Sequence, residues 1–178
     1  DVTSTFTSAI GKVSSISSGI SVTVDILKNG GSAPVIDGSD DQLYIMDATS
    51  LILPTLMPTI VSRIVLGFEV TAHIDNGYVV QLMESGNLVS GTYQIQDVTD
   101  GEVTLGSSEY GAKSSDTTIS SSTFDTVDTS ITSSFQDIAT ESSTKFEDRN
   151  FLTLKAATAS IQSGEYTQSI SIIASGNF

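Results

Sequence analysis

The sequence contains no cysteine, no tryptophan and a single histidine, His73, among 178 residues. The absence of cysteine excludes disulfide bonds, thiolate catalysis, cysteine-ligated zinc and iron–sulfur clusters. A lone imidazole leaves no histidine-rich metal site, and no Gly-x-Ser-x-Gly elbow is present to activate a serine. With 7% aromatic residues, a sugar-stacking cleft between two catalytic carboxylates is also disfavoured. We therefore expect no enzyme activity and no catalytic residues, and we interpret His73 as a surface or sheet-packing side chain.

Basic residues are scarce as well, since seven Lys and Arg stand against 21 Asp and Glu, for a net charge of -14. So negative a chain cannot neutralise a phosphate backbone, and nucleic acid is excluded as a partner. No run of 18 apolar residues occurs, so we expect no membrane span. Acidic, lysine-poor and hydroxyl-rich sequences suit extracellular surfaces. We accordingly interpret Asp1 as a mature N-terminus left by a removed signal peptide, and expect a secreted or cell-surface protein.

What the sequence does contain in quantity is small hydroxyl residues, with 30 Ser and 22 Thr. Residues 16–26 alternate between apolar and polar side chains, which predicts one strand that ends at the turn 28–31. A second alternating strand covers 60–74 and stops at Asp75, Asn76 and Gly77, so that 78–83 should return antiparallel to it. Shorter strands are expected at 88–89, 93–98, 103–105, 151–154 and 166–174. Many short strands with regular turns predict an all-β antiparallel sandwich or barrel.

Residues 113–148 are ambiguous, because half of them are Ser or Thr. Ile119, Val127 and Ile131 share one face of a strand, whereas Phe124, Val127, Ile131, Phe135 and Ile138 have helical spacing. Ser and Thr form helices poorly because their hydroxyls compete for the backbone. We favour strands and loops here, with one short helix over 129–140 as the alternative.

The N-terminal residues 1–10 alternate on their own account and precede Gly11. They form either the first strand of their own sandwich or an arm that completes the sheet of a neighbouring copy. Such a head-to-tail contact does not close, and it generates a filament. Under the second interpretation the chain comprises a donor strand, 1–12, and a β-sandwich domain, 13–178.

Both ends of the chain resemble a known type of protein. The opening VTSTFTSAI, residues 2–10, and the ending SGEYTQSISI, residues 163–172, resemble secreted pilins of the chaperone–usher and spore coat protein U type. Many of those pilins carry a disulfide that this chain lacks, and cysteine-free strand-donating surface filaments of bacteria and archaea fit equally well. The resemblance implies an incomplete, immunoglobulin-like antiparallel β-sandwich with an N-terminal donor strand. It further implies that Val2, Phe6 and Ile10 fill an apolar groove, one edge of which is lined by Tyr166, Ile170 and Ile172.

Two acidic turns raise the question of a metal. Asp37, Ser39 and Asp41 offer oxygen ligands at alternating positions, and Asp97, Asp100 and Glu102 surround Gly101. Calcium is the cation that such loops suit, although neither loop matches an EF-hand. The sequence suggests no other cofactor.

Together these observations predict a structural subunit of an extracellular filament, a pilus or matrix fibre, that polymerises with identical subunits by donor-strand complementation. The alternative is a monomeric secreted or cell-surface recognition or adhesion module, calcium-dependent or not, with an unidentified surface or host ligand.

Overall fold

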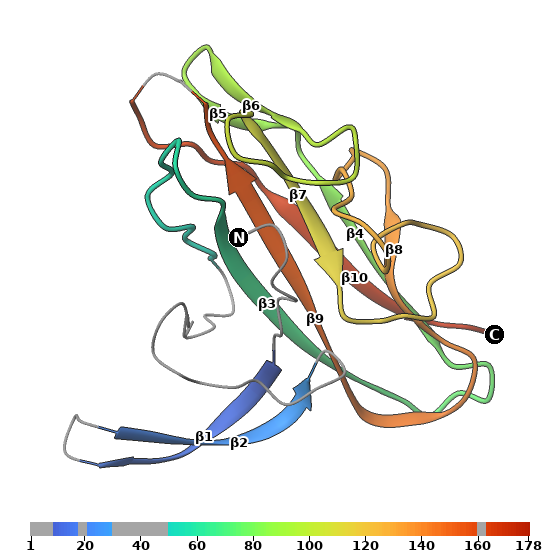
Figure 1. Ribbon diagram of the computed structural model, residues 1–178. Coiled ribbons are helices and arrows are strands. Elements are labelled where there is room, and N and C mark those ends of the chain that lie inside the picture. Colours follow the sequence, from blue (N-terminus) through green and yellow to red (C-terminus); the bar gives the residue numbers. More distant parts are fainter. Residues whose placement is uncertain (1–8, 18–20, 30–49, 160–162) are drawn as a thin grey trace. The chain divides into compact units, whose positions relative to one another are not determined.

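The computed structural model describes residues 9–17, 21–29, 50–159 and 163–178 (Figure 1). The chain divides into two compact units, Asp1–Ile45 and Met46–Phe178. Every regular element in the described ranges is a strand, so the protein is all-β.

The first unit contains an antiparallel hairpin of β1 (Ala9–Ser17) and β2 (Ser21–Asn29). The single strand predicted over 16–26 was therefore wrong, because β1 ends and β2 begins within that range. Only three residues separate the two strands, and the alternation continues across them without a change of phase. The alternation of apolar and polar residues therefore gives no sign that the chain reverses direction between β1 and β2.

The second unit contains two sheets (Figure 1). The larger has the strand order β3-β9-β7-β6-β5 and the smaller the order β10-β4-β8. The strands are β3 (Ser62–Ala72), β4 (Tyr78–Glu84), β5 (Leu88–Ser90), β6 (Tyr93–Asp97), β7 (Glu109–Ser114), β8 (Gln136–Glu141), β9 (Lys145–Ala157) and β10 (Ile170–Gly176). All pairs are antiparallel except β6 with β7, which run parallel. The connection between these two strands includes 103–105, which form no strand, contrary to expectation.

β3 and β4 occupy the ranges that the alternation predicts, but they do not pair with each other. β3 pairs with β9, whereas β4 pairs with β10 and β8 in the other sheet. The turn between them closes through the N–H of Gly77, which donates to the carbonyl of Ile74 at 2.9 Å. Gly77 has a φ of 74°, which glycine adopts without steric cost. Asn-Gly therefore makes the predicted tight turn, but the turn carries the chain from one sheet to the other.

The hydroxyl-rich range 113–148 contains no helix and includes the strand β8. Of the five residues with helical spacing, Phe124, Ile131 and Ile138 are fully buried, whereas Val127 and Phe135 are about 40% exposed (39% and 43%). These five residues are therefore divided between the core and the surface. One face of a single helix would bury all of them together, whereas strands and loops allow the division. The expectation of strands and loops is confirmed.

One core cluster bears directly on the candidate site. It consists of Leu88, Ile95, Tyr110 and Ala156, and it receives the partly buried side chains of Leu53, Leu56 and Tyr166. These residues come from β5, β6, β7, β9 and two segments outside the strands. The cluster thus joins the larger sheet to the chain that leads into β10.

Candidate docking groove

The described part of the second unit bears a large, partly open cavity of about 1280 Å³, with more apolar than polar lining. Its lining comes from the larger sheet, the segment 50–58, and the segment 163–170 with the first residues of β10. Pockets for small ligands are typically roughly 300–1,000 Å³, and protein interiors otherwise pack as densely as organic crystals. The cavity is therefore larger than a small molecule needs, and it has room for an extended segment of chain.

The floor of the cavity follows from alternation along two paired strands. Ile64 of β3 lies opposite Leu154 of β9, and Leu66 lies opposite Leu152. Since successive side chains in a strand point to opposite faces, these alternate residues share one face. All four line the cavity. Ile64, Leu152 and Leu154 are buried, at 8%, 0% and 8% exposure, so these pairs form the packed base of the groove rather than its open surface.

β10 forms the more open side of the cavity. In the described part of the chain it has a strand neighbour, β4, on one side only. Ile172, which lines the cavity, is 36% exposed, and Ile173, which follows it, is 42% exposed. A strand edge with apolar residues on both faces can accept main-chain hydrogen bonds and side-chain contacts from an added strand.

A buried polar group lies beside the cavity, and two of its residues, Tyr110 and Gln168, line it. The hydroxyl of Tyr110 donates to Oε2 of Glu84 at 2.6 Å, and Nε2 of Gln168 donates to the same oxygen at 2.9 Å. Glu84 is 3% exposed and Tyr110 2%. These bonds connect β4, β7 and the chain that precedes β10, so they hold these three parts of the second unit together.

Burial dominates the electrostatics of this polar group. It raises the pKa of Glu84, while the hydrogen bonds from Tyr110 and Gln168 oppose the rise. It raises the pKa of Asp97 as well, against hydrogen bonds from Tyr110 and the backbone of Ile131. Burial also raises the pKa of Tyr110 far above its ordinary value, so its hydroxyl remains a donor at physiological pH. The region is therefore sensitive to the charge state of its two carboxyl groups.

The residues predicted to bound the acceptor groove come together in the structure. Tyr166, Ile170 and Ile172 all line the cavity. Ile170 and Ile172 belong to β10, whereas Tyr166 precedes the strand and packs on the core cluster. The sequence analysis missed the floor of the cavity on β3 and β9. The alternation of each strand can be seen in the sequence, but the pairing of the two strands cannot. Leu53 and Leu56 were missed as well, because the segment around them has no periodic pattern.

The predicted donor residues are placed only in part. Val2 and Phe6 lie outside the described residues, as does most of the arm 1–12. Ile10 lies in β1, where it pairs with Lys28 of β2. The boundary after residue 12 therefore falls inside a strand that continues to Ser17.

The candidate metal ligands Asp37, Ser39 and Asp41 also lie outside the described residues. Within the ranges that the structure covers, no three His, Cys, Asp or Glu side chains gather to hold a metal ion. In the second acidic turn, Oδ1 of Asp100 accepts a hydrogen bond from the N–H of Glu102 at 3.1 Å, as in an ordinary turn.

His73 is exposed and stacks edge-on against the ring of Phe146, with ring centroids 4.5 Å apart. The contact places it where the sequence interpretation put it, on the surface of the sheet. Among the described residues, no helix is long and apolar enough to cross a membrane.

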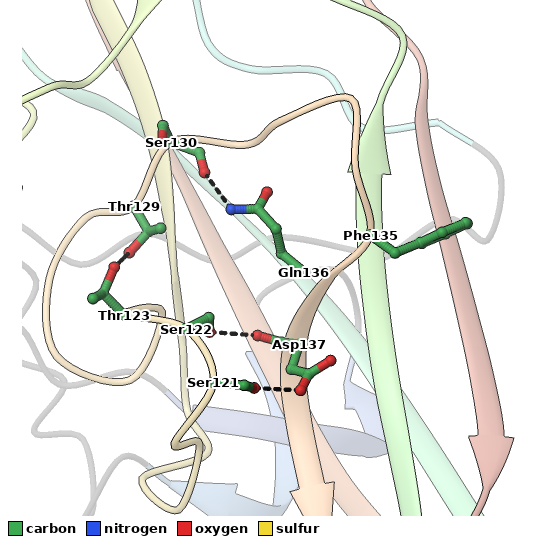
Figure 2. A pocket seen from close by; sticks show the side chains of 8 residues that line it. All are labelled: Ser121, Ser122, Thr123, Thr129, Ser130, Phe135, Gln136 and Asp137. Carbon is green, nitrogen blue, oxygen red and sulfur yellow. Dashed lines mark hydrogen bonds between the residues drawn. The ribbon is translucent and has the colours of Figure 1, made fainter.

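A second, smaller pocket lies beside β8 and is lined by eight residues, shown in Figure 2. Its polar groups bond mainly to one another. Asp137 accepts hydrogen bonds from Ser121 and, at 2.7 Å, from Gln81, while Nε2 of Gln136 donates to the carbonyl of Ser130 at 3.2 Å. The ring of Phe135 points away from the other side chains (Figure 2). These hydrogen bonds fasten a loop to β8.

Comparisons of the chain with protein-family models, curated proteins and solved structures returned no match. A function therefore has to be inferred from the geometry of the groove and the pattern of the sequence.

Proposed function

We propose that this protein is a structural subunit of an extracellular filament, a pilus or matrix fibre, and that the N-terminal strand of each copy fills the groove of the next. The observation that carries the proposal is the large cavity beside β10. β10 pairs with β4 along one edge, and its other edge has no strand neighbour in the described chain. With that strand supplied, the two sheets would form a complete immunoglobulin-like sandwich.

The N-terminal sequence has the pattern that such a groove requires. Val2, Phe6 and Ile10 are even-numbered, so in an extended strand they share one face, with Thr5 and Thr7 on the other. Burying a large apolar side chain contributes about 1.5–3 kcal/mol, and main-chain hydrogen bonds to β10 add to this. Three such side chains would contribute about 4.5–9 kcal/mol, which is comparable to the roughly 4–15 kcal/mol that joining two molecules costs, so the main-chain hydrogen bonds to β10 have to supply the surplus.

Strand donation between identical chains is head-to-tail, so each added copy presents a new empty groove and the assembly grows as a filament. The net charge of -14 and the abundance of Ser and Thr keep such a polymer hydrated. Like-charge repulsion between filaments opposes indiscriminate bundling. No catalysis is required of the subunit.

The test is negative-stain electron microscopy of the intact chain, of Phe6→Asp and of Thr5→Asp. Both variants add one negative charge to the same strand, but on opposite faces. We expect filaments from the intact chain and from Thr5→Asp, and monomers with an unchanged circular dichroism spectrum from Phe6→Asp. Filaments from Phe6→Asp, or a large loss of its thermal stability as a monomer, would contradict strand donation by this segment.

The acceptor side is tested with Ile172→Asp, matched by Ser171→Asp on the neighbouring position of β10. Ile172→Asp keeps its donor strand and loses its groove, whereas Phe6→Asp keeps its groove and loses its donor. Neither should polymerise alone, but an equimolar mixture should form dimers that grow no further. A mixture that stays monomeric would show that these two residues do not meet in one interface.

A further inference from the structure

The segment 50–58 lies along the groove without belonging to either sheet. All of its residues except Met57 line the cavity, and none of them forms part of a strand. We propose that this segment is a removable occupant of the groove, and that the incoming N-terminal strand of a neighbouring copy displaces it. The inference rests on the proposed function, and it adds a step that controls when a subunit can accept its neighbour.

Two leucines attach the segment to the core. Leu53 and Leu56 are partly buried and pack on the core cluster that also receives Tyr166. The residues beside them are more exposed, with Ile52 at 81% and Met57 at 46%. The attachment to the cluster therefore depends on two side chains, neither of which is fully buried. Because Tyr166 is a predicted acceptor residue, a donor side chain that reaches it competes with these leucines for one small cluster.

The segment is poorly suited to pair with a strand. Pro54 and Pro58 have no N–H to donate to a ladder of hydrogen bonds. Among the described residues, no main-chain hydrogen bond joins the segment to β3 or β10. The carbonyl of Met57 accepts a hydrogen bond from the N–H of Ile60 at 3.2 Å, which closes a local turn. The segment thus fills part of the groove with side chains and leaves the edge of β10 without a strand.

The N-terminal strand offers the hydrogen bonds that the segment does not. Residues 2–12 contain no proline, so each of them has an N–H available for pairing. The edge of β10 opposite β4, which has no strand neighbour in the described chain, can receive them. The three apolar side chains of the donor also replace the contacts that Leu53 and Leu56 give up. The exchange therefore gains main-chain hydrogen bonds at little cost in apolar burial.

An occupied groove weakens and delays the capture of a neighbour. Only the molecules whose segment has left can bind the strand in full, and the apparent dissociation constant rises by the inverse of that fraction. The segment also covers part of an apolar cluster that an unpolymerised subunit would otherwise expose to water. It thereby stabilises the monomer and slows its assembly.

The first test measures the binding of a labelled peptide of residues 1–12 to the monomeric Phe6→Asp protein by fluorescence anisotropy. Two double variants in this background each remove two apolar side chains of the segment: Leu53→Ser with Leu56→Ser, and Ile52→Ser with Met57→Ser. We expect the leucine variant to bind the peptide at least about tenfold more tightly, because burying even one such side chain corresponds to that factor. The exposed pair should leave the affinity unchanged.

Equal or weaker binding by the leucine variant would overturn the inference, since it would make the leucines a permanent wall of the groove. A peptide that binds none of these proteins would overturn the proposed function, and the inference with it. Binding without the expected gain in affinity overturns the inference alone.

A second measurement follows the segment itself. The chain contains no tryptophan, so Leu56→Trp in the Phe6→Asp background introduces a single reporter on the segment. Addition of the peptide should shift its emission to the red, because the indole leaves the core cluster for water. Thr55→Trp, at an exposed neighbouring position, should keep its emission unchanged. A constant or blue-shifted emission from Leu56→Trp on peptide binding would show that the segment stays in the groove, against the inference.

Discussion

The hydroxyl of Tyr110 provides a sharp test of how the groove is held together. Tyr110→Phe removes the donor that lies 2.6 Å from Oε2 of Glu84 and leaves the ring in place. Both residues are almost fully buried, so no water replaces the lost donor without rearrangement. Gln168 then remains as the described side chain that donates to this carboxylate.

The expected loss of unfolding free energy in Tyr110→Phe follows from the negative charge of the acceptor, Glu84. A hydrogen bond to a charged group contributes about 1.5–3 kcal/mol, and removing one partner leaves the buried carboxylate under-solvated. We expect Tyr110→Phe to lower the free energy of unfolding by that amount at pH 7. Tyr93→Phe is the matched control, because Tyr93 is 51% exposed and its substitution should change stability by less than about 0.5 kcal/mol.

The pH dependence of the folding stability provides a second test of the role of Tyr110. Burial raises the pKa values of Glu84 and Asp97 in the folded protein above their unfolded values. A raised carboxyl pKa contributes stability that is fully present below the unfolded pKa and is lost as the pH rises through the folded pKa. These two groups therefore make the protein more stable at pH 4 than at pH 7.

Removing the Tyr110 donor raises the pKa of Glu84 further, because that hydrogen bond lowers it. The penalty of Tyr110→Phe should consequently shrink as the pH falls and Glu84 takes up a proton. Glu84→Gln should remove this part of the pH dependence, since both donors bond to a single oxygen that the amide retains. The assay is urea denaturation followed by far-ultraviolet circular dichroism at pH 4 and pH 7. A penalty that is constant or grows toward acid would refute the reasoning.

Two further substitutions test the framework of the second unit. Lys155→Met leaves the carboxylate of Asp128, whose side chain is 2% exposed, without the ammonium that lies 2.8 Å away, and should cost about 3–5 kcal/mol in urea denaturation. A cost below about 1 kcal/mol would mean that the pair behaves like a surface ion pair. Gly77→Ala places a methyl group in a clash with the carbonyl oxygen of Glu141, whereas Gly91→Ala meets nothing within 4 Å at a similar φ. Melting temperatures should fall much further for Gly77→Ala, and equal losses would show that φ alone matters.

Strand positions could be predicted from the sequence because alternation reports which face a residue occupies. The ranges of β3 and β4 followed from that pattern and from the Asn-Gly turn between them. Alternation does not report which strands are neighbours, so the pairing of these two strands was predicted wrongly. Sheet membership depends on contacts between distant parts of the chain, which no local pattern encodes.

The candidate groove, too, could be predicted only where it depends on a local sequence pattern. Its β10 edge could be predicted, because Ile170 and Ile172 alternate next to a recognisable turn. Its β3–β9 floor could not, because those strands meet only through the folded topology. The bulge in β1, where the register with β2 shifts between Val13 and Ser15, was equally invisible, since a single extra residue reverses the phase of a strand without altering its composition.

The pairing of β10 with β4 has a consequence for how the molecule folds. β4 is made early in the unit, yet its partner follows about a hundred residues later, and the N–H of Asn177 donates to the carbonyl of Gly77 at 3.0 Å. Domains dominated by such non-local pairings fold slowly, because the entropy cost of closing a long loop comes before the stabilising contacts between its ends can form. During synthesis, the smaller sheet therefore stays incomplete until residues 170–177 have emerged. The β10 side of the groove therefore forms only after residues 170–176 have been synthesised.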